Sequence, residues 1–136
     1  MNAKQWLGRA RHIKREIDLL RKTKEKAFDD VTKITQSYEA DGAQTSKDPH
    51  KFDRLVEFEG TIDEMLDELY ETETEILRAI LELDDRRQKY VLIAYYINMQ
   101  TIEKIAVEMN YSFRQITNIR RRGIQEIGKR IGDKMK

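Results

Sequence analysis

The stretch 101–122, TIEKIAVEMNYSFRQITNIRRR, decides the fold that we expect for this chain. Thr101 and Ser112 are residue types that cap the starts of helices, and Gln115 follows Ser112 at the capping-box spacing. Asn110 lies between the two helical patterns and tolerates the left-handed backbone that a tight turn needs. The stretch therefore predicts a short helix, a turn and a second helix.

Six positions in this stretch fill the roles that a helix-turn-helix requires. These roles are a small residue at the helix crossing, an apolar residue near the end of the first helix, a turn former with an apolar neighbour, and apolar anchors on the second helix. The residues that fill them are Ala106, Met109, Asn110, Tyr111, Ile116 and Ile119. The first helix is expected over about 102–109. A supporting helix is expected over about 85–98, with an apolar body of Tyr90, Val91, Ile93, Ala94 and Ile97.

The second helix carries side chains suited to reading base edges. Its inward side is predicted to consist of Ile116, Ile119, Gly123, Ile127 and Ile131. The N-terminal part of a recognition helix enters the major groove, so the predicted base-reading set is Ser112, Phe113, Arg114, Thr117, Asn118 and Arg121. An arginine bridges guanine O6 and N7, and an asparagine bridges adenine N6 and N7. Arg114 and Asn118 are therefore the principal expected readers.

A second group of residues suits the DNA backbone. The predicted phosphate contacts are Thr101, Lys104, Arg122 and Lys129, the first two at a helix start whose free N–H groups also attract an anion. Arg120 projects toward the flank of the apolar side, so we expect it to pair with an acidic group such as Glu103 rather than with DNA. The expected partner of the whole surface is double-stranded DNA.

Two long heptad patterns precede this region. Apolar residues at alternating steps of four and three run over 6–38 and again over 52–83, interrupted by Lys24, Glu59 and Glu73, whose charged ends are expected to reach water. Turn-forming Asp-Gly and Asp-Pro pairs lie between the patterns. The predicted fold is all-α, with an antiparallel coiled-coil hairpin over 1–83, a loop at 39–51, and a helix-turn-helix domain over 84–136.

Composition narrows the function classes. The chain has 136 residues, 38% of them charged, with one proline and no cysteine, which excludes disulfides and thiolate metal sites. Residues 52–84 carry 12 acidic and 2 basic groups, whereas 85–136 carry 12 basic and 5 acidic ones. No apolar run reaches the roughly 20 residues that span a bilayer, so we expect a cytoplasmic protein without a membrane partner.

No pattern of residues indicates an enzyme. His12 and His50 have no nucleophile at a useful spacing, and there is no glycine-rich phosphate loop. The carboxylates Asp63, Glu64, Asp67 and Glu68 are typical of a solvated helix face rather than of a metal cluster. We therefore expect no catalytic residues, no metal and no cofactor.

The stretch TIEKIAVEMNYSFRQITNIRRRGIQEI resembles the helix-turn-helix of sigma-factor region 4, over roughly residues 84–131. At Phe113, Arg114, Thr117 and Asn118, the sequence differs from the residues that housekeeping sigma factors carry at the corresponding positions. With WLGRARHIKREID and SKDPHKFDRL included, the whole chain is similar to a prophage-encoded family of Gram-positive bacteria, related to the ArpU and RinA regulators of late phage genes. The resemblance implies a transcriptional regulator.

Three functions agree with these patterns. The first is a sequence-specific DNA-binding regulator of phage or prophage genes, whose hairpin forms a homo-oligomer or contacts RNA polymerase. The second is a DNA-packaging adaptor of the small-terminase kind. The third is a coiled-coil interaction protein, such as an anti-sigma-like adaptor, whose basic module binds an acidic protein surface.

Overall fold

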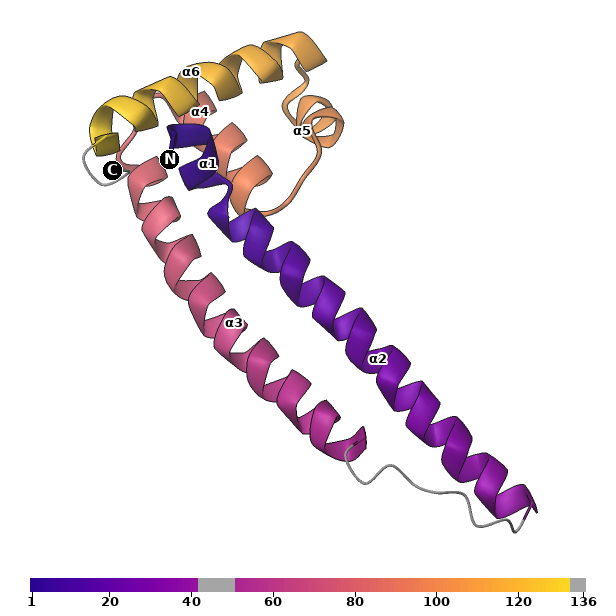
Figure 1. Ribbon diagram of the computed structural model, residues 1–136. Coiled ribbons are helices and arrows are strands. Elements are labelled where there is room, and N and C mark those ends of the chain that lie inside the picture. Colours follow the sequence, from indigo (N-terminus) through magenta and orange to yellow (C-terminus); the bar gives the residue numbers. More distant parts are fainter. Residues whose placement is uncertain (42–50, 133–136) are drawn as a thin grey trace. The chain divides into compact units, whose positions relative to one another are not determined.

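The structure is a computed structural model that describes the backbone of residues 1–41 and 51–132 and the side chains of 1–30 and 53–132. Figure 1 shows its elements, which are all helices. They are α1 (Ala3–Leu7), α2 (Arg9–Asp41), α3 (Lys51–Leu81), α4 (Arg86–Leu92), the π-helical turn η1 (Ile93–Ile97), α5 (Ile102–Met109) and α6 (Phe113–Ile131). The described backbone contains no strand, so the all-α prediction is confirmed.

The chain forms two compact units. One combines Met1–Ile13 with Leu69–Lys136, and the other is Lys14–Glu68. This division differs from the predicted boundary between residues 83 and 84, because the N-terminal residues group with the C-terminal helices. The heptad pattern predicted correctly that Trp6 is buried, at 3% exposure. A periodic pattern identifies which face of a helix is buried, but not which element covers it.

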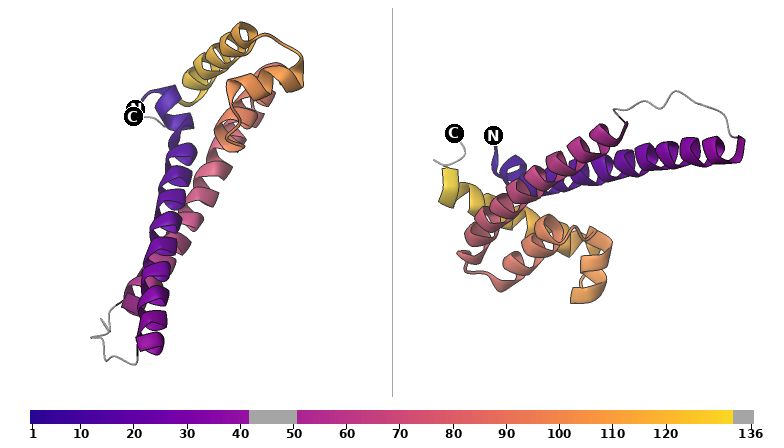
Figure 2. Two further views of the ribbon diagram at one scale, coloured as in Figure 1. Left: turned by 90° about the vertical axis from the view of Figure 1, so that its right-hand side faces the viewer. Right: turned by 90° about the horizontal axis from the view of Figure 1, so that it is seen from below.

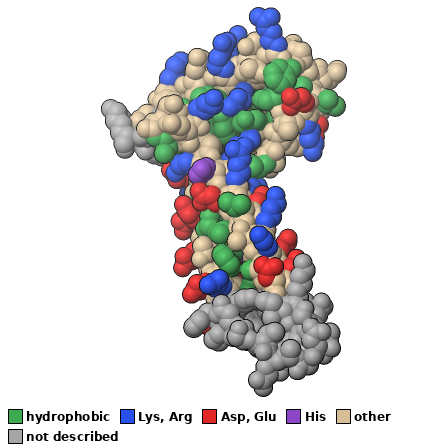
Figure 3. Space-filling view, turned by 45° about the vertical axis from the view of Figure 1, so that its right-hand side comes forward, with side chains coloured by type: hydrophobic (Ala, Val, Ile, Leu, Met, Phe, Trp, Pro, Cys, Tyr) green, Lys and Arg blue, Asp and Glu red, His purple; other side chains and the backbone are tan. Residues whose placement is uncertain are grey.

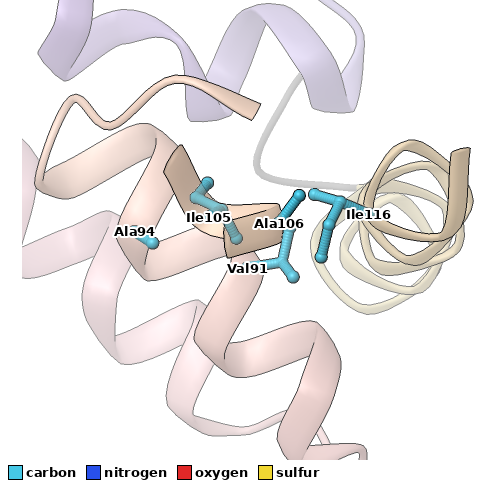
Figure 4. Close-up of a cluster of buried hydrophobic side chains, with 5 residues drawn as sticks. All are labelled: Val91, Ala94, Ile105, Ala106 and Ile116. Atoms are coloured by element: carbon cyan, nitrogen blue, oxygen red, sulfur yellow. The ribbon is translucent and has the colours of Figure 1, made fainter. Parts of the chain in front are cut away.

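A cluster of small and branched apolar side chains forms the core around α4, η1, α5 and α6. Its buried members are Val91, Ala94, Ile105, Ala106 and Ile116 (Figure 4). Ala106 lies where α5 meets α6, as the sequence predicts, and Met109, Tyr111 and Ile119 pack against the cluster while partly buried. Tyr90, predicted to belong to the apolar body, is instead 45% exposed, and its hydroxyl donates to Glu108 at 3.3 Å.

The supporting helix predicted over 85–98 is divided into α4 and η1. Asp85 caps its start, since its carboxylate accepts from the N–H groups of Arg87 and Gln88 at 2.8 and 3.2 Å. At the other end, the N–H of Asn98 donates to the carbonyl of Ile93, which widens the last turn to π-helical geometry. Met99 follows with a positive φ of 60°, and this residue turns the chain toward α5.

Helix α6 makes two close contacts with other helices of the unit that combines Met1–Ile13 with Leu69–Lys136. Gly123 of α6 faces α4 so closely that a β-carbon there would lie 2.9 Å from Leu92 Cδ1. Five residues along α6, a β-carbon on Gly128 would lie 3.4 Å from the β-carbon of Ala3, because α1 packs against α6. Glycine at position 123 thus permits a helix approach that any larger residue would obstruct.

The unit Lys14–Glu68 consists of parts of α2 and α3, which Figure 2 shows in two further views. Ile17, Leu55 and Ile62 are buried, as their heptad positions predict. Lys24 donates to the Glu59 carboxylate, so two of the charged residues that interrupt the apolar pattern bond to each other. Such a pair sets the register of two helices more than it stabilises them.

The connection between α2 and α3 was predicted at residues 39–51. The structure continues α2 to Asp41 and begins α3 at Lys51, which leaves residues 42–50 between the two helices. Those nine residues lie outside the described part of the chain. The predicted apolar positions whose side chains also lie outside it are Val31, Ile34, Tyr38 and Phe52.

Candidate nucleic-acid interface

The turn between α5 and α6 has a defined hydrogen-bond pattern. Asn110 adopts the left-handed conformation, with φ 59° and ψ 43°. The N–H of Tyr111 donates to the carbonyl of Ala106 at 2.9 Å, and the N–H of Asn110 donates to that of Val107 at 3.3 Å. These two bonds make a Schellman motif, which satisfies the last carbonyls of α5. The turn therefore fixes where α6 begins relative to α5.

Both helix starts predicted from the sequence are capped as expected. The Ser112 hydroxyl accepts from the N–H of Gln115 at 3.1 Å, and the Gln115 side chain accepts from the N–H of Ser112 at 2.8 Å. The Thr101 hydroxyl likewise accepts from the N–H of Lys104 at 3.2 Å. Ser112 can still donate its hydroxyl proton to an acceptor in DNA, because capping uses only a lone pair of the oxygen.

The base-reading set predicted from the sequence lies on the first two turns of α6 and at its cap. Five of its six members are exposed, namely Ser112, Phe113, Arg114, Thr117 and Arg121, and Asn118 is partly buried. Phe113 is 54% exposed, so it does not pack beneath the helix start. The Thr117 hydroxyl donates to the carbonyl of Phe113 at 3.0 Å. Because its hydroxyl proton is used in this bond, Thr117 is expected to contact a base through its methyl group.

The predicted phosphate contacts lie at two places. Thr101 and Lys104 are exposed at the start of α5, and Arg122 and Lys129 are exposed on α6. Lys129 bonds to Glu126 at 3.3 Å, but both side chains are largely solvated. An exposed pair of this kind contributes only tenths of a kcal/mol, so a phosphate can displace it. Arg114, Arg121 and Arg122 make no ion pair with any residue whose side chain the structure describes.

Arg120 is held by aromatic rings rather than by the predicted Glu103. Its guanidinium carbon lies 4.3 Å from the ring centroid of Tyr95, and it donates to the Tyr96 hydroxyl at 3.1 Å. Arg11 approaches the same Tyr95 ring at 4.1 Å and donates to the Tyr95 carbonyl at 2.9 Å. Burial raises the pKa of Tyr96 above its usual 10.0, although the Arg120 hydrogen bond acts in the opposite direction.

Positive charge dominates α6. Between Phe113 and Ile131 there are six basic side chains and one acidic side chain. In Figure 3, blue side chains gather over the part of the molecule that carries α6. An unbalanced cationic surface of this kind attracts polyanions over several ångströms in solution of moderate salt.

The structure adds one element that the sequence reasoning missed. Lys4 of α1 lines a surface hollow of about 240 Å³ together with residues of α6. The sequence pattern assigned residues 1–13 to the hairpin, and no local pattern places Lys4 near α6. The contact arises only from the folding of the N-terminus against the C-terminal helices.

Among the described residues, no group of histidine, aspartate and glutamate side chains is arranged to hold a metal ion. None of the described helices combines the length and the apolar character needed to cross a membrane. Comparison with known proteins gives no match to the chain among family models, curated proteins or solved structures.

Proposed function

We propose that the protein is a sequence-specific DNA-binding regulator of transcription, in which α5, the turn at Asn110 and α6 form a helix-turn-helix. The observation that carries the proposal is the start of α6. There a capping box and a Schellman turn fix a helix on which Arg114, Arg121 and Arg122 have no acidic partner among the described side chains, whereas Arg130 pairs with Asp84. A fixed helix with unpaired Arg114 and Arg121 suits the major groove of double-stranded DNA.

The two groups of side chains have different roles in the proposed DNA binding. Arg114, Asn118 and Arg121 read base edges, with Ser112, Phe113 and Thr117 as supporting contacts. Thr101, Lys104, Arg122 and Lys129 bind phosphates and position the helix without reading sequence. The resemblance to ArpU- and RinA-type regulators supports phage or prophage genes as the targets.

A binding experiment separates these roles. Arg114→Ala and Asn118→Ala should each weaken binding to the preferred duplex by about 1–3 kcal/mol, roughly 5- to 150-fold, and leave binding to unrelated duplexes nearly unchanged. Arg122→Ala should weaken binding to all duplexes equally. It should also reduce the salt dependence of binding by the amount expected for the loss of about one phosphate contact. Unchanged affinity and preference in both base-reading variants would refute the assignment of α6 as the reader.

We further propose that α2 and α3 form a helical hairpin through which the protein self-associates. In the unit Lys14–Glu68, the side chains of Leu19, Phe28 and Val56 are 65%, 55% and 69% exposed. Complete burial of a fully exposed side chain of this size contributes about 1.5–3 kcal/mol, so burial of the exposed part of these three favours a partner surface on a second copy. Contact with RNA polymerase is the alternative use of this surface.

The mass in solution tests this part of the proposal. A dimer is expected for a regulator that binds two half-sites. A ring of eight or more copies would favour the packaging adaptor instead. Failure to bind any duplex at low salt would favour the interaction protein, whose basic module binds an acidic protein surface.

A further inference from the structure

A hollow with a mostly apolar open surface lies along the flank of α6, beside the proposed base-reading face. Its volume is about 240 Å³, and its lining consists of Lys4, Thr117, Arg120, Arg121, Ile124 and Gln125. Three of these residues are cationic and none is acidic. Thr117 and Arg121 also belong to the proposed base-reading set, so the hollow lies at the edge of that surface.

None of the described acidic side chains forms an ion pair with the cationic residues that line the hollow. Lys4 is exposed, and neither Lys4 nor Arg121 forms an ion pair with a described side chain. Arg120 is partly buried, its guanidinium is held by Tyr95 and Tyr96, and its Nε atom is buried without a hydrogen-bond partner. An anion near these cations would gain favourable electrostatic energy without displacing an ion pair.

Among the lining residues, Lys4 and Arg121 have donors that suit a phosphate oxyanion, whereas the Arg120 guanidinium is held by Tyr95 and Tyr96. Arginine offers a planar set of N–H donors that matches phosphate oxygens, and lysine supplies a compact point charge. The Gln125 amide adds neutral donors on the same side of α6. A carboxylate on this lining would oppose such binding, and there is none.

We propose that Lys4, which lines this hollow together with residues of α6, binds a backbone phosphate of the DNA that α6 contacts and so adds a contact from the N-terminal helix α1. The inference rests on the proposed function. It adds α1 to the proposed DNA interface, because α1 packs against α6 and Lys4 lines the hollow beside the proposed base-reading face. Residues from both ends of the chain then hold one stretch of DNA backbone.

The test replaces Lys4 with glutamine in the full chain. Loss of one phosphate contact lowers the slope of log K against log salt by about 0.9, which corresponds to about fivefold weaker binding near 0.15 M salt. The loss should be equal for preferred and unrelated duplexes, since a phosphate contact carries no sequence information. Lys4→Arg should restore both the affinity and the slope.

A matched control removes the same charge elsewhere. Lys22 is an exposed lysine of α2 in the unit Lys14–Glu68, outside the unit that holds α6. Lys22→Gln should bind DNA as the wild type does. Because Lys4 is exposed, Lys4→Gln should keep the helical circular dichroism of the wild type, which excludes unfolding as the cause of weaker binding.

Three results would overturn the inference, and they have different meanings. If the wild type binds DNA and Lys4→Gln binds it with the same slope, the hollow is not part of the interface, although the proposed function stands. If inorganic phosphate saturates the amide shifts of Lys4 and Thr117 while DNA binding is independent of Lys4, the hollow is a small-anion site. If the wild type binds no duplex, the proposed function fails as well.

Discussion

Replacement of Gly123 by alanine tests how closely α4 and α6 pack. The new β-carbon would lie 2.9 Å from Leu92 Cδ1 and 3.2 Å from Leu92 Cγ, inside the usual carbon separation of about 3.5–4.0 Å. Leu92 is fully buried, so its side chain has no solvent-filled space into which it can move. Overpacking of this kind costs about 1–3 kcal/mol, which is a large fraction of the stability of a small domain.

Gly128→Ala is the matched control because it lies on the same helix. Its β-carbon would lie 3.4 Å from the β-carbon of Ala3, which is ordinary contact. Both changes remove a helix-interior glycine and gain roughly 0.5–1 kcal/mol from that alone, so the difference between them isolates the contact with Leu92. Urea denaturation followed by circular dichroism should show Gly123→Ala less stable than Gly128→Ala by about 1–3 kcal/mol. Equal stability of the two variants would refute the close packing of α4 and α6.

Two further predictions concern the turn and the aromatic cluster. Asn110→Ala should lower the free energy of unfolding by about 1 kcal/mol, and Asn110→Gly should not, because only glycine and asparagine adopt the left-handed conformation at little cost. Thermal unfolding checks this prediction, and equal melting temperatures for both variants would contradict the left-handed conformation of residue 110. Burial raises the pKa of Tyr96, so its stabilising contribution is complete below pH 10.0 and is lost as the pH rises through the folded-state pKa. The free energy of unfolding of Tyr96→Phe should therefore fall less than that of the wild type as the pH rises above 10. If the free energy of unfolding falls equally steeply in both proteins, the raised pKa of Tyr96 does not contribute to it.

The local features of the fold were predictable from the sequence because they depend on neighbouring residues. Thr101, Ser112 and Asn110 cap or end helices through bonds that reach no further than five residues along the chain. The same residue types occur at such positions in proteins of every fold. The start of α6, and therefore the placement of Arg114 and Asn118 on its first turns, could be predicted for this reason.

The contacts that sequence reasoning missed join residues far apart in the chain. Arg11 and Tyr95 are 84 positions apart in the sequence. Arg120, which lies in α6, also stacks on the ring of Tyr95. Helix periodicity indicated that Trp6 is buried, but it could not indicate that α1 packs against α6. The π-helical turn at Ile93–Ile97 was missed because its apolar residues also fit a regular α-helix.

Selection of bound fragments from a pool of random DNA duplexes tests the central claim most directly. We predict that the wild type enriches one short motif. Arg114→Ala should lose the preference for a guanine at one position of that motif, and Asn118→Ala should lose the preference for an adenine at another. Enrichment of no motif by the wild type, or of the same motif with undiminished preference by both variants, would contradict the account.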